Sequence, residues 1–374
     1  MSKLKLMIVV GTRPEIIRLS EVIKACDKFF DLVFVHTGQN YDYELNKVFF
    51  ENFQLREPDF YLASPGEHLG ETVGNIISRS YKLIEEVKPD AFLVLGDTNS
   101  CLAAYSAKRH KVPIFHMEAG NRCFDFNVPE EINRRIVDQL ADVNLAYTEN
   151  ARRYLNSEGN NKDFVYVTGS PMTEVLYKNK EQIENSDIIE RLSITKKEYF
   201  IVSMHREENI DTDDRFSSLI EALNAVAETY KYPLIFSTHP RTKKRLESES
   251  VKLHQLINNL NPLGFFDYTK LQQNAYCVLS DSGTVPEESA ILNFPAVVIR
   301  NSTERPEALD GGAIILGGYD TTGVIAAIDI AVGLSEENRR NPVRDYHDTN
   351  VSEKVVKIIQ SYTQIVEQRV FSKR

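Results

Sequence analysis

Cysteines are few in this sequence and lie far apart. The 374 residues contain four of them, Cys26, Cys101, Cys123 and Cys277, and none belongs to a C-x-x-C motif. The N-terminal residues also lack the pattern of a secretory signal. Reduced thiols in a cytoplasmic protein are therefore the simplest interpretation.

Long apolar runs and an excess of positive charge are also missing. No run approaches the roughly 20 residues that a membrane-spanning helix needs, so a membrane-embedded role is not expected. The chain has 44 Lys and Arg against 54 Asp and Glu, a net charge of -10. This balance argues against nucleic acid as the main partner, because a phosphate backbone attracts a basic surface. A small phosphorylated ligand is compatible with the negative net charge, because binding it needs only a few local cations.

Several catalytic and cofactor signatures are absent as well. No G-x-G-x-x-G follows the first predicted strand, which argues against a nicotinamide dinucleotide, and there is no P-loop. No spacing of His, Asp or Glu is typical of a metal site, and no G-x-S-x-G indicates a serine nucleophile. We therefore expect neither a metal nor a redox cofactor.

Short apolar segments alternate with segments of helical period along the whole chain. Valine, isoleucine and leucine dominate the apolar segments, which predicts parallel strands in sheets that helices cover on both faces. The strands are predicted at Leu4–Val10, Leu32–His36, Ala91–Leu95, Ile114–Met117 and Val143–Tyr147, and then at Tyr199–Met204, Leu234–Ser237, Tyr276–Leu279, Ala296–Ile299 and Ala313–Leu316.

These two series of strands predict an α/β protein with two doubly wound, Rossmann-like domains that face each other across a cleft. The first domain is expected at residues 1–170 and the second at 171–354. The amphipathic C-terminal segment, 355–374, is expected to pack back on the first domain. Ligands of such domains bind beyond the carboxyl ends of the strands, so functional residues are sought there.

Three carboxylates follow strand or loop ends of the first domain, at Asp97, Glu118 and Glu130. Removing and replacing a proton on opposite faces of a carbon needs two positioned acid–base groups. Burial and mutual repulsion would raise the pKa of one such carboxyl towards neutrality. For each residue alone, a helix cap or an arginine partner is the alternative. Arg13 follows the first predicted strand, and its side chain either pairs with a phosphate or is exposed to solvent.

A phosphate-binding pattern occurs in the second domain. A strand ends at Leu279, the residues Ser282-Gly283-Thr284 form a turn, and a helix is predicted to begin near Pro286. The free N–H groups and the positive end of that helix suit a diphosphate, and Glu288 in its first turn suits ribose hydroxyls. The alternative is that Ser282 only caps the helix. His205, at another strand end beside charged neighbours, is a further acid–base candidate.

Taken together, the motifs identify a family. The chain resembles the bacterial non-hydrolysing UDP-N-acetylglucosamine 2-epimerases over essentially its whole length. The matching motifs, in order, are GTRPE, GDT, HMEAG, PEE-x-NR, MHREEN, SDSG-x-x-x-EE and TERPE.

The resemblance implies a GT-B fold, usually as a homodimer, and a reaction without a cofactor. UDP is eliminated anti across C1–C2 to give a 2-acetamidoglucal and is added back with C2 protonated on the other face. The resemblance places proton transfer and leaving-group departure on Asp97, Glu118, Glu130 and His205. It places substrate and UDP binding on Arg13, Arg18, Arg134, Arg206, Tyr268 (near the uracil), Ser282, Gly283, Thr284, Glu288 and Arg305.

Several positions depart from the family pattern. Arg18 replaces the usual lysine after GTRPE-x-x, and arginine cannot act as a base at neutral pH. Glu207 stands where an arginine is common, and Thr284 where a glycine is common. The segments GTRPEIIRLS and GNRCFD resemble the capsule and O-antigen branch that acts on UDP-6-deoxy-L-sugars. That branch makes UDP-N-acetyl-L-fucosamine from its L-talo epimer.

A segment associated with a second UDP-sugar site in some relatives is also altered. It reads Gly38-Gln39-Asn40-Tyr41-Asp42-Tyr43, with Asn40 in place of a histidine and Tyr43 in place of a methionine. We expect hyperbolic kinetics without activation by UDP-N-acetylglucosamine, because allostery needs a second ligand that distinguishes two states.

Other functions remain as alternatives. A 2-epimerase of UDP-N-acetylglucosamine and UDP-N-acetylmannosamine differs only in its sugar. A GT-B glycosyltransferase shares fold and donor but needs an acceptor groove rather than clustered carboxylates. A hydrolysing 2-epimerase would release free sugar, and a non-catalytic UDP-sugar sensor would not need the acid–base residues.

Overall fold

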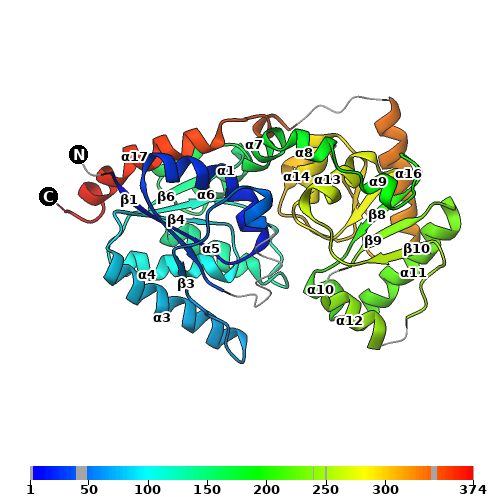
Figure 1. The fold of residues 1–374 in the computed structure, drawn as a ribbon, viewed down its shortest axis with the longest axis horizontal. Coiled ribbons are helices and arrows are strands. Elements are labelled where there is room, and N and C mark those ends of the chain that lie inside the picture. Colours follow the sequence, from blue (N-terminus) through cyan, green and yellow to red (C-terminus); the bar gives the residue numbers. More distant parts are fainter. Residues whose placement is uncertain (1–2, 39–48, 239, 249–250, 338–342, 374) are drawn as a thin grey trace. The chain divides into compact units, whose positions relative to one another are not determined.

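A computed structural model describes residues 3–38, 49–238, 240–248, 251–337 and 343–373 of the chain. They form two compact units, Met1–Tyr177 together with His347–Arg374, and Lys178–Tyr346. Each unit is a parallel sheet with helices packed on it (Figure 1). The boundary lies a little beyond the join expected around residue 170. Gln39–Tyr43 of the altered segment lie outside the described residues.

The first unit contains a sheet of seven parallel strands in the order β3-β2-β1-β4-β5-β6-β7. Its middle strands are buried along their whole length because helices cover both faces, as the continuous apolar sequences predict. The strands are β1 (Lys5–Val10), β2 (Asp31–His36), β3 (Phe60–Tyr61), β4 (Ala91–Leu95), β5 (Ile114–Met117), β6 (Val143–Ala146) and β7 (Val165–Val167).

The helices of this unit connect successive strands, and the C-terminal helix returns to it. Helix α17 (Val351–Arg369) packs against α1 (Arg13–Phe29) through a buried apolar stripe that includes Val355 and Ile359. The others are α3 (Leu69–Val87), the 3₁₀ turn η1 (Asn99–Ala103), α4 (Ala104–Arg109), α5 (Glu130–Leu140), α6 (Glu149–Ser157), η2 (Lys162–Phe164) and α7 (Pro171–Lys178).

The second unit contains six parallel strands in the order β10-β9-β8-β11-β12-β13. These are β8 (Phe200–Ser203), β9 (Leu234–Ser237), β10 (Ile257–Leu260), β11 (Cys277–Ser280), β12 (Ala296–Val298) and β13 (Ile315–Leu316). Its helices are α8 (Lys180–Glu184), α9 (Ile188–Arg191), α10 (Glu207–Ile210), α11 (Asp213–Tyr230), α12 (Pro240–Ser248), α13 (Phe265–Asn274), α14 (Val285–Leu292), α15 (Pro306–Asp310), α16 (Thr321–Glu337) and η3 (Arg344–Tyr346).

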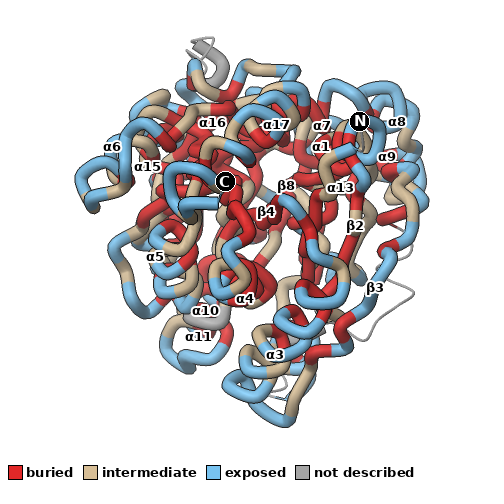
Figure 2. The backbone as a smooth tube through the Cα atoms, turned by 90° about the vertical axis from the view of Figure 1, so that its left-hand side faces the viewer, coloured by how far each residue is buried: buried red, intermediate tan, exposed pale blue. Residues whose placement is uncertain are grey.

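Side chains alternate between the two faces of the second sheet and build a separate core on each. Phe200 and Val202 pack on the face covered by α11 and α16, whereas Ile201 packs on the other face with residues of α13 and α14. This is the period of two that a strand imposes. The buried backbone follows the strands of both sheets in Figure 2.

The strand order of each unit reverses direction once, which fixes where a ligand is expected. The reversal lies between β1 and β4 in the first unit and between β8 and β11 in the second. In open α/β sheets the crevice at this point, beyond the carboxyl ends of the strands, is the usual ligand site. The GTRPE and GDT segments follow β1 and β4, and the MHREEN and SDSG segments follow β8 and β11.

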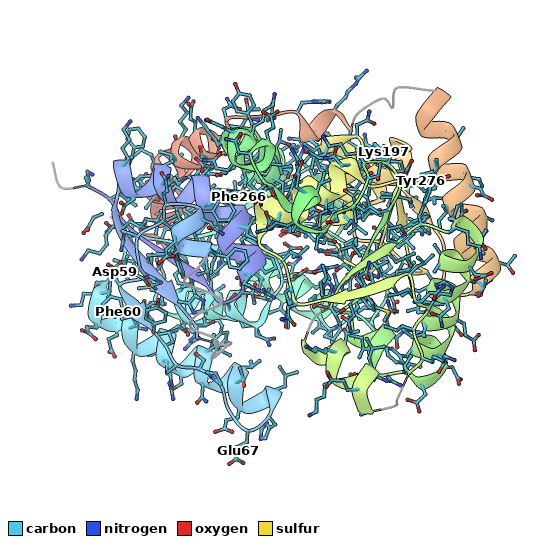
Figure 3. All side chains as sticks on the ribbon, turned by 45° about the vertical axis from the view of Figure 1, so that its right-hand side comes forward. Asp59, Phe60, Glu67, Lys197, Phe266 and Tyr276 are labelled. Carbon is cyan, nitrogen blue, oxygen red and sulfur yellow. The ribbon has the colours of Figure 1, made fainter. Side chains whose placement is uncertain are left out.

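At the amino ends of β8 and β11, opposite the expected ligand site, the side chains pack against one another. Tyr276, just before β11, packs edge-on against Phe200 and Tyr232. The amine of Lys197 donates hydrogen bonds to the main-chain oxygens of Gln273 and Ala275, at 3.1 Å each. Lys197 and Tyr276 are labelled in Figure 3. At these strand ends the side chains complete the hydrophobic core.

The predicted fold class of two parallel-sheet α/β domains is confirmed, and every predicted strand is present. Three short strands, β3, β7 and β10, were not predicted. Each lies at an edge of its sheet, and β10 carries two exposed asparagines, Asn258 and Asn259, in place of an apolar run. Among the described residues, no helix is long and apolar enough to cross a membrane.

Candidate active site at the strand ends

Glu15 ties together the turns that follow β1 and β4. Its carboxylate accepts hydrogen bonds from the Gly11 N–H at 3.0 Å, from the Thr12 hydroxyl at 2.8 Å and from the Ser100 hydroxyl. The side chain is buried, and this burial raises the pKa of Glu15 to about 6 although the donors oppose it. Glu15 therefore fixes the position of the loop that carries Asp97.

Asp97 is held by Arg134 of α5. The Arg134 Nε and Nη2 atoms both donate to Oδ2 of Asp97, at 3.0 and 2.5 Å, and Nη1 donates to Glu131 at 2.9 Å. Burial raises the pKa of Asp97. Arg134 counteracts this effect, whereas the charges of Glu118 and Glu130 add to it. The structure thus places Glu118 and Glu130 within electrostatic reach of Asp97.

Glu118 lies directly after β5 in a left-handed backbone conformation, with a φ of 65°. Such a conformation is uncommon for a residue with a side chain and is often found at functional positions. Its carboxylate forms an ion pair with Arg18 and accepts hydrogen bonds from Asn121 at 3.1 Å and from the Tyr147 hydroxyl at 3.3 Å. Both carboxylate oxygens of Glu118 thus have donors.

A buried network below this turn holds its backbone. Both oxygens of Asp138 accept the N–H of Gly120, at 3.2 Å each. The same carboxylate pairs with His116 Nδ1 at 2.9 Å and with Arg122 at 2.7 Å, and all three side chains are fully buried. Gly120 has a φ of 83°, and a Cβ there would lie 2.4 Å from the Ala151 oxygen. Only glycine fits at this position.

Glu130 and Arg13 complete the predicted residues of the first unit. Glu130 is half-buried and begins α5. Arg13 begins α1 and lies over the ring of Phe49, 5.7 Å from its centroid. A cation over an aromatic face is a favourable contact, so Arg13 has a fixed location near the β1 turn.

The SDSG turn of the second unit leads into α14 as predicted. Thr284 is the residue that caps α14, and the Ser282 hydroxyl accepts the Thr284 N–H at 3.3 Å. The helix cap is thus Thr284, and the Ser282 hydroxyl supports the start of the helix with this hydrogen bond. Gly283 leaves room for its neighbours, because a Cβ there would lie 3.0 Å from the Arg206 guanidinium and 3.4 Å from Glu304.

Glu288 and Tyr268 lie close together beside this turn. Glu288 is buried in the first turn of α14 and accepts a hydrogen bond from Gln272 at 2.6 Å. Tyr268 comes from α13, and its pKa is raised by burial first and then by the charge of Glu288. An acidic acceptor near an aromatic ring matches what a ribose and a flat base require.

Comparison with known proteins decides the family. The model of the family described as UDP-N-acetylglucosamine 2-epimerase matches residues 24–360. The chain belongs to this family. It is 36% identical to the UDP-N-acetylglucosamine 2-epimerase of Methanocaldococcus jannaschii over 366 residues, which are 95% of this chain and 99% of that protein.

Solved structures support the same assignment. The structure of UDP-N-acetylglucosamine 2-epimerase from Rickettsia bellii superposes with a TM-score of 0.92 at 44% identity, over 99% of this chain and 100% of that chain. The structure of the M. jannaschii enzyme in complex with UDP-GlcNAc and UDP superposes with a TM-score of 0.89 at 35% identity, over 96% of this chain and 100% of that chain. A relative from Pseudomonas aeruginosa, UDP-2,3-diacetamido-2,3-dideoxy-D-glucuronate 2-epimerase, is 32% identical over 88% of this chain and 93% of that protein. The protein is thus an epimerase with a GT-B-like fold.

Two predicted arginines of this epimerase are paired within the second unit. Arg206 Nη2 lies 3.5 Å from Glu304, which Arg300 also binds through two contacts at 3.0 and 3.1 Å. Arg305 is almost fully buried, and its Nη2 lies 3.1 Å from Glu287. Arg206 therefore borders the SDSG turn, whereas Arg305 has a partner in the interior.

Motif reasoning did not single out several supports of the epimerase site. Glu15 and Asp281 belong to recognised motifs but had no assigned role, and Asn121, Asp138 and Tyr147 were not considered. The signal available for Tyr147 and Asp281 was their position directly at the end of a predicted strand. No group of His, Cys, Asp and Glu among the described residues has the arrangement of a metal site.

Proposed function

We propose that this epimerase inverts C2 of a UDP-linked N-acetylated sugar by anti elimination of UDP and its re-addition. The observation that carries the proposal is the interaction of Asp97 with the nearby charges of Glu118 and Glu130 in the first unit. The turn Ser282–Thr284 and Glu288 supply the nucleotide-binding features of the second unit.

The chemistry explains why both sets of residues are needed. The C2 proton has no adjacent carbonyl and is only weakly acidic, so departure of a good leaving group from C1 must share the work. Fixed donors around the diphosphate stabilise the charge that develops as the C1–O bond breaks. The same groups keep UDP available for re-addition to the glucal.

The contacts of the two inner carboxylates support different roles. Glu118 receives donors on both oxygens, from Arg18, Asn121 and Tyr147, which favours its charged form. Asp97 receives Arg134 on Oδ2 only, and within the described residues no hydrogen bond reaches Oδ1. We assign Glu118 as the base that removes the C2 proton and Asp97 as the acid that delivers a proton through Oδ1 to the other face.

The arginines divide between carboxylates and phosphates in this scheme. Arg18 and Arg134 are committed to Glu118 and Asp97. Arg13, near the β1 turn, and Arg206, beside Gly283, are the cations we assign to the diphosphate. Arg305 is assigned to hold Glu287 below α14.

The sugar proposed is a UDP-6-deoxy-L-HexNAc, converted from the L-talo to the L-fuco form for a capsule or O-antigen precursor in the cytoplasm. The segments GTRPEIIRLS and GNRCFD support this choice. The first holds Arg18, and the second follows the Glu118 turn, so both lie beside the acid–base residues. The alternative sugar pair is UDP-GlcNAc and UDP-ManNAc; the Methanocaldococcus and Rickettsia relatives are named as UDP-N-acetylglucosamine 2-epimerases.

Product analysis tests the function. Purified enzyme is incubated with D- and L-configured UDP-HexNAc donors in D2O, and products are examined by NMR. We expect an epimerised UDP-sugar with deuterium at C2, with the L-configured 6-deoxy donor turned over fastest. Free sugar plus UDP would indicate a hydrolase, and no reaction without an acceptor would indicate a transferase. Protium retained at C2 would contradict the two-base scheme.

A homodimer is also proposed. Helices α4 and α5 contact each other and expose large apolar side chains, Tyr105 at 47%, Ile132 at 50% and Ile136 at 44%. Ile132 and Ile136 lie one turn apart on α5 and form a stripe that a second copy could cover. Light scattering of the wild type and of Ile132→Lys/Ile136→Lys tests this, with a monomer expected only for the variant.

A further inference from the structure

Asp281 lies where the second sheet brings two strand ends together. It follows β11 directly, and β11 pairs with β8 so that Ser280 is opposite Ser203. The Asp281 N–H donates to the Ser203 oxygen at 3.2 Å. A side chain at the end of β11 is therefore next to the turn that leaves β8, which begins the MHREEN segment with His205.

The Asp281 carboxylate collects the donors of that turn. It accepts the His205 N–H on both oxygens, at 3.1 and 3.0 Å, the Arg206 N–H at 3.0 Å and the Asn209 side-chain amide at 3.1 Å. Burial by itself would raise the pKa of Asp281, but His205 and the N–H donors outweigh burial and lower it. The carboxylate is thus a permanent, fully buried anion.

The same carboxylate also contacts the imidazole ring. Nδ1 of His205 lies 3.2 Å from Oδ1 of Asp281, and the His205 side chain is 39% exposed while that of Asp281 is fully buried. A hydrogen bond at one ring nitrogen decides which tautomer the ring adopts. Here the acceptor at Nδ1 requires the hydrogen on Nδ1, so in the neutral ring Nε2 carries the lone pair.

We propose that Asp281 is a positioning residue that orients His205 and fixes its tautomer. The inference rests on the proposed function and adds to it that His205 assists departure and return of UDP. The protonated imidazole donates its Nε2 proton to the departing diphosphate oxygen as the C1–O bond breaks, and takes that proton back when UDP is added again. Asp281 stays ionised throughout and balances the positive charge of the protonated ring. Because Ser282–Thr284 follow Asp281 in the chain, the same residue also sets the start of the nucleotide-binding turn.

The direct test is the tautomer of His205. The ring nitrogens are observed by ¹⁵N NMR in the wild type and in Asp281→Ala, both with UDP bound, and His205→Ala identifies the signals. We expect the Nδ1–H form in the wild type and a shift towards the Nε2–H form in the variant. An unchanged tautomer in Asp281→Ala would overturn the proposal. If Asp281→Ala does not fold, Asp281→Asn takes its place, and we then expect a weakened Nδ1 hydrogen bond, seen as a displaced Nδ1 signal. An undisplaced signal would equally overturn the proposal.

A double-mutant cycle separates orientation of the ring from support of the turn. We expect His205→Ala to lower kcat by about 10²-fold or more, and the Asp281 variant to lower kcat in the wild type but to add little in the His205→Ala background. A multiplied loss in the double variant would show that Asp281 acts structurally and not through His205.

A control variant and two contradicting outcomes complete the test. Asn209→Ala removes a donor to Asp281 without touching the ring, so it should lower Tm but leave the tautomer unchanged. Normal turnover in His205→Ala would refute the role of His205 in the proposed function. A slow His205→Ala enzyme with a multiplicative Asp281 effect would refute only the positioning role.

Discussion

The guanidinium of Arg18 and the carboxylate of Glu118 form an ion pair between residues 100 positions apart in the sequence. The pair joins α1 to the turn after β5, and both side chains are largely buried, at 5% and 12% exposed. The guanidinium of arginine has a rigid, planar shape that matches a carboxylate.

Replacing Arg18 should therefore slow catalysis more than it weakens nucleotide binding. Arg18→Met leaves Glu118 without its cation in a buried place, and we expect kcat to fall by about 10²-fold. The kcat of Arg18→Lys should lie between that of Arg18→Met and that of the wild type, because lysine retains the charge but not the paired N–H donors of the guanidinium. Steady-state kinetics measure both. Arg152→Met, which breaks the half-exposed pair with Glu149, is the control and should be normal, and a normal Arg18→Met would contradict the role of the pair.

The three clustered carboxylates should each matter for turnover. Asp97→Asn, Glu118→Gln and Glu130→Gln should each lower kcat by about 10²- to 10⁴-fold, because each removes a proposed acid–base group. Calorimetry with UDP should give affinities near that of the wild type, since none of the three variants changes a residue that we assign to the nucleotide. Glu149→Gln provides a surface control. Near-normal turnover of all three variants would rule out the assignment.

Glu288→Ala should show the reverse behaviour. It removes a charged acceptor that we assign to the ribose hydroxyls, and hydrogen bonds to charged groups contribute about 1.5–3 kcal/mol. UDP affinity measured by calorimetry should fall by roughly 10- to 100-fold. The exposed Glu221→Ala on α11 serves for comparison. Unchanged UDP binding in Glu288→Ala would place the ribose elsewhere.

Glu15 should make the stability of the protein depend on pH. The pKa of Glu15 is raised in the folded protein from 4.5 to about 6, so the folded state holds this proton more tightly than the unfolded state. The contribution to stability is complete below pH 4.5 and is lost as the pH rises through 6. Between pH 4.5 and 7.5 the wild type should lose about 2 kcal/mol relative to Glu15→Gln in urea unfolding. Parallel pH curves for the two proteins would show that Glu15 is not responsible.

The fold was predictable because its determinants are local. Most central strands are short, mainly apolar runs, such as AFLVL in β4 and FIVS in β8, and such runs are recognised without knowledge of the neighbouring strands. The edge strands β3, β7 and β10 were missed because an edge strand is stabilised by pairing with one neighbour and needs no apolar run of its own. The two and three residues of β3 and β7 carry too little pattern to distinguish a strand from a loop, and two of the four residues of β10 are asparagines.

The candidate site was predictable in its positions but not in its partners. Asp97, Glu118 and His205 were predicted because polar residues that follow a strand lie at the carboxyl ends of the sheet, and the structure places them there. The pairing of Arg18 with Glu118, or of Asp281 with His205, depends on which strands become neighbours. Arg18 and Arg134 were expected on the substrate side, yet both bind carboxylates. An arginine in a motif does not by itself reveal which anion it meets.

The return of α17 to the first unit has a consequence for synthesis of the chain. Lys178–Tyr346 is continuous, whereas the first unit needs residues 347–374 to cover α1. Growing from its N-terminus, a nascent chain completes the interior unit before the unit that it started. Until α17 emerges from the ribosome, the apolar face of α1 stays uncovered and is open to chaperones. A nonsense mutation near residue 350 would thus spare the nucleotide-binding unit and leave the one with the carboxylates unfinished.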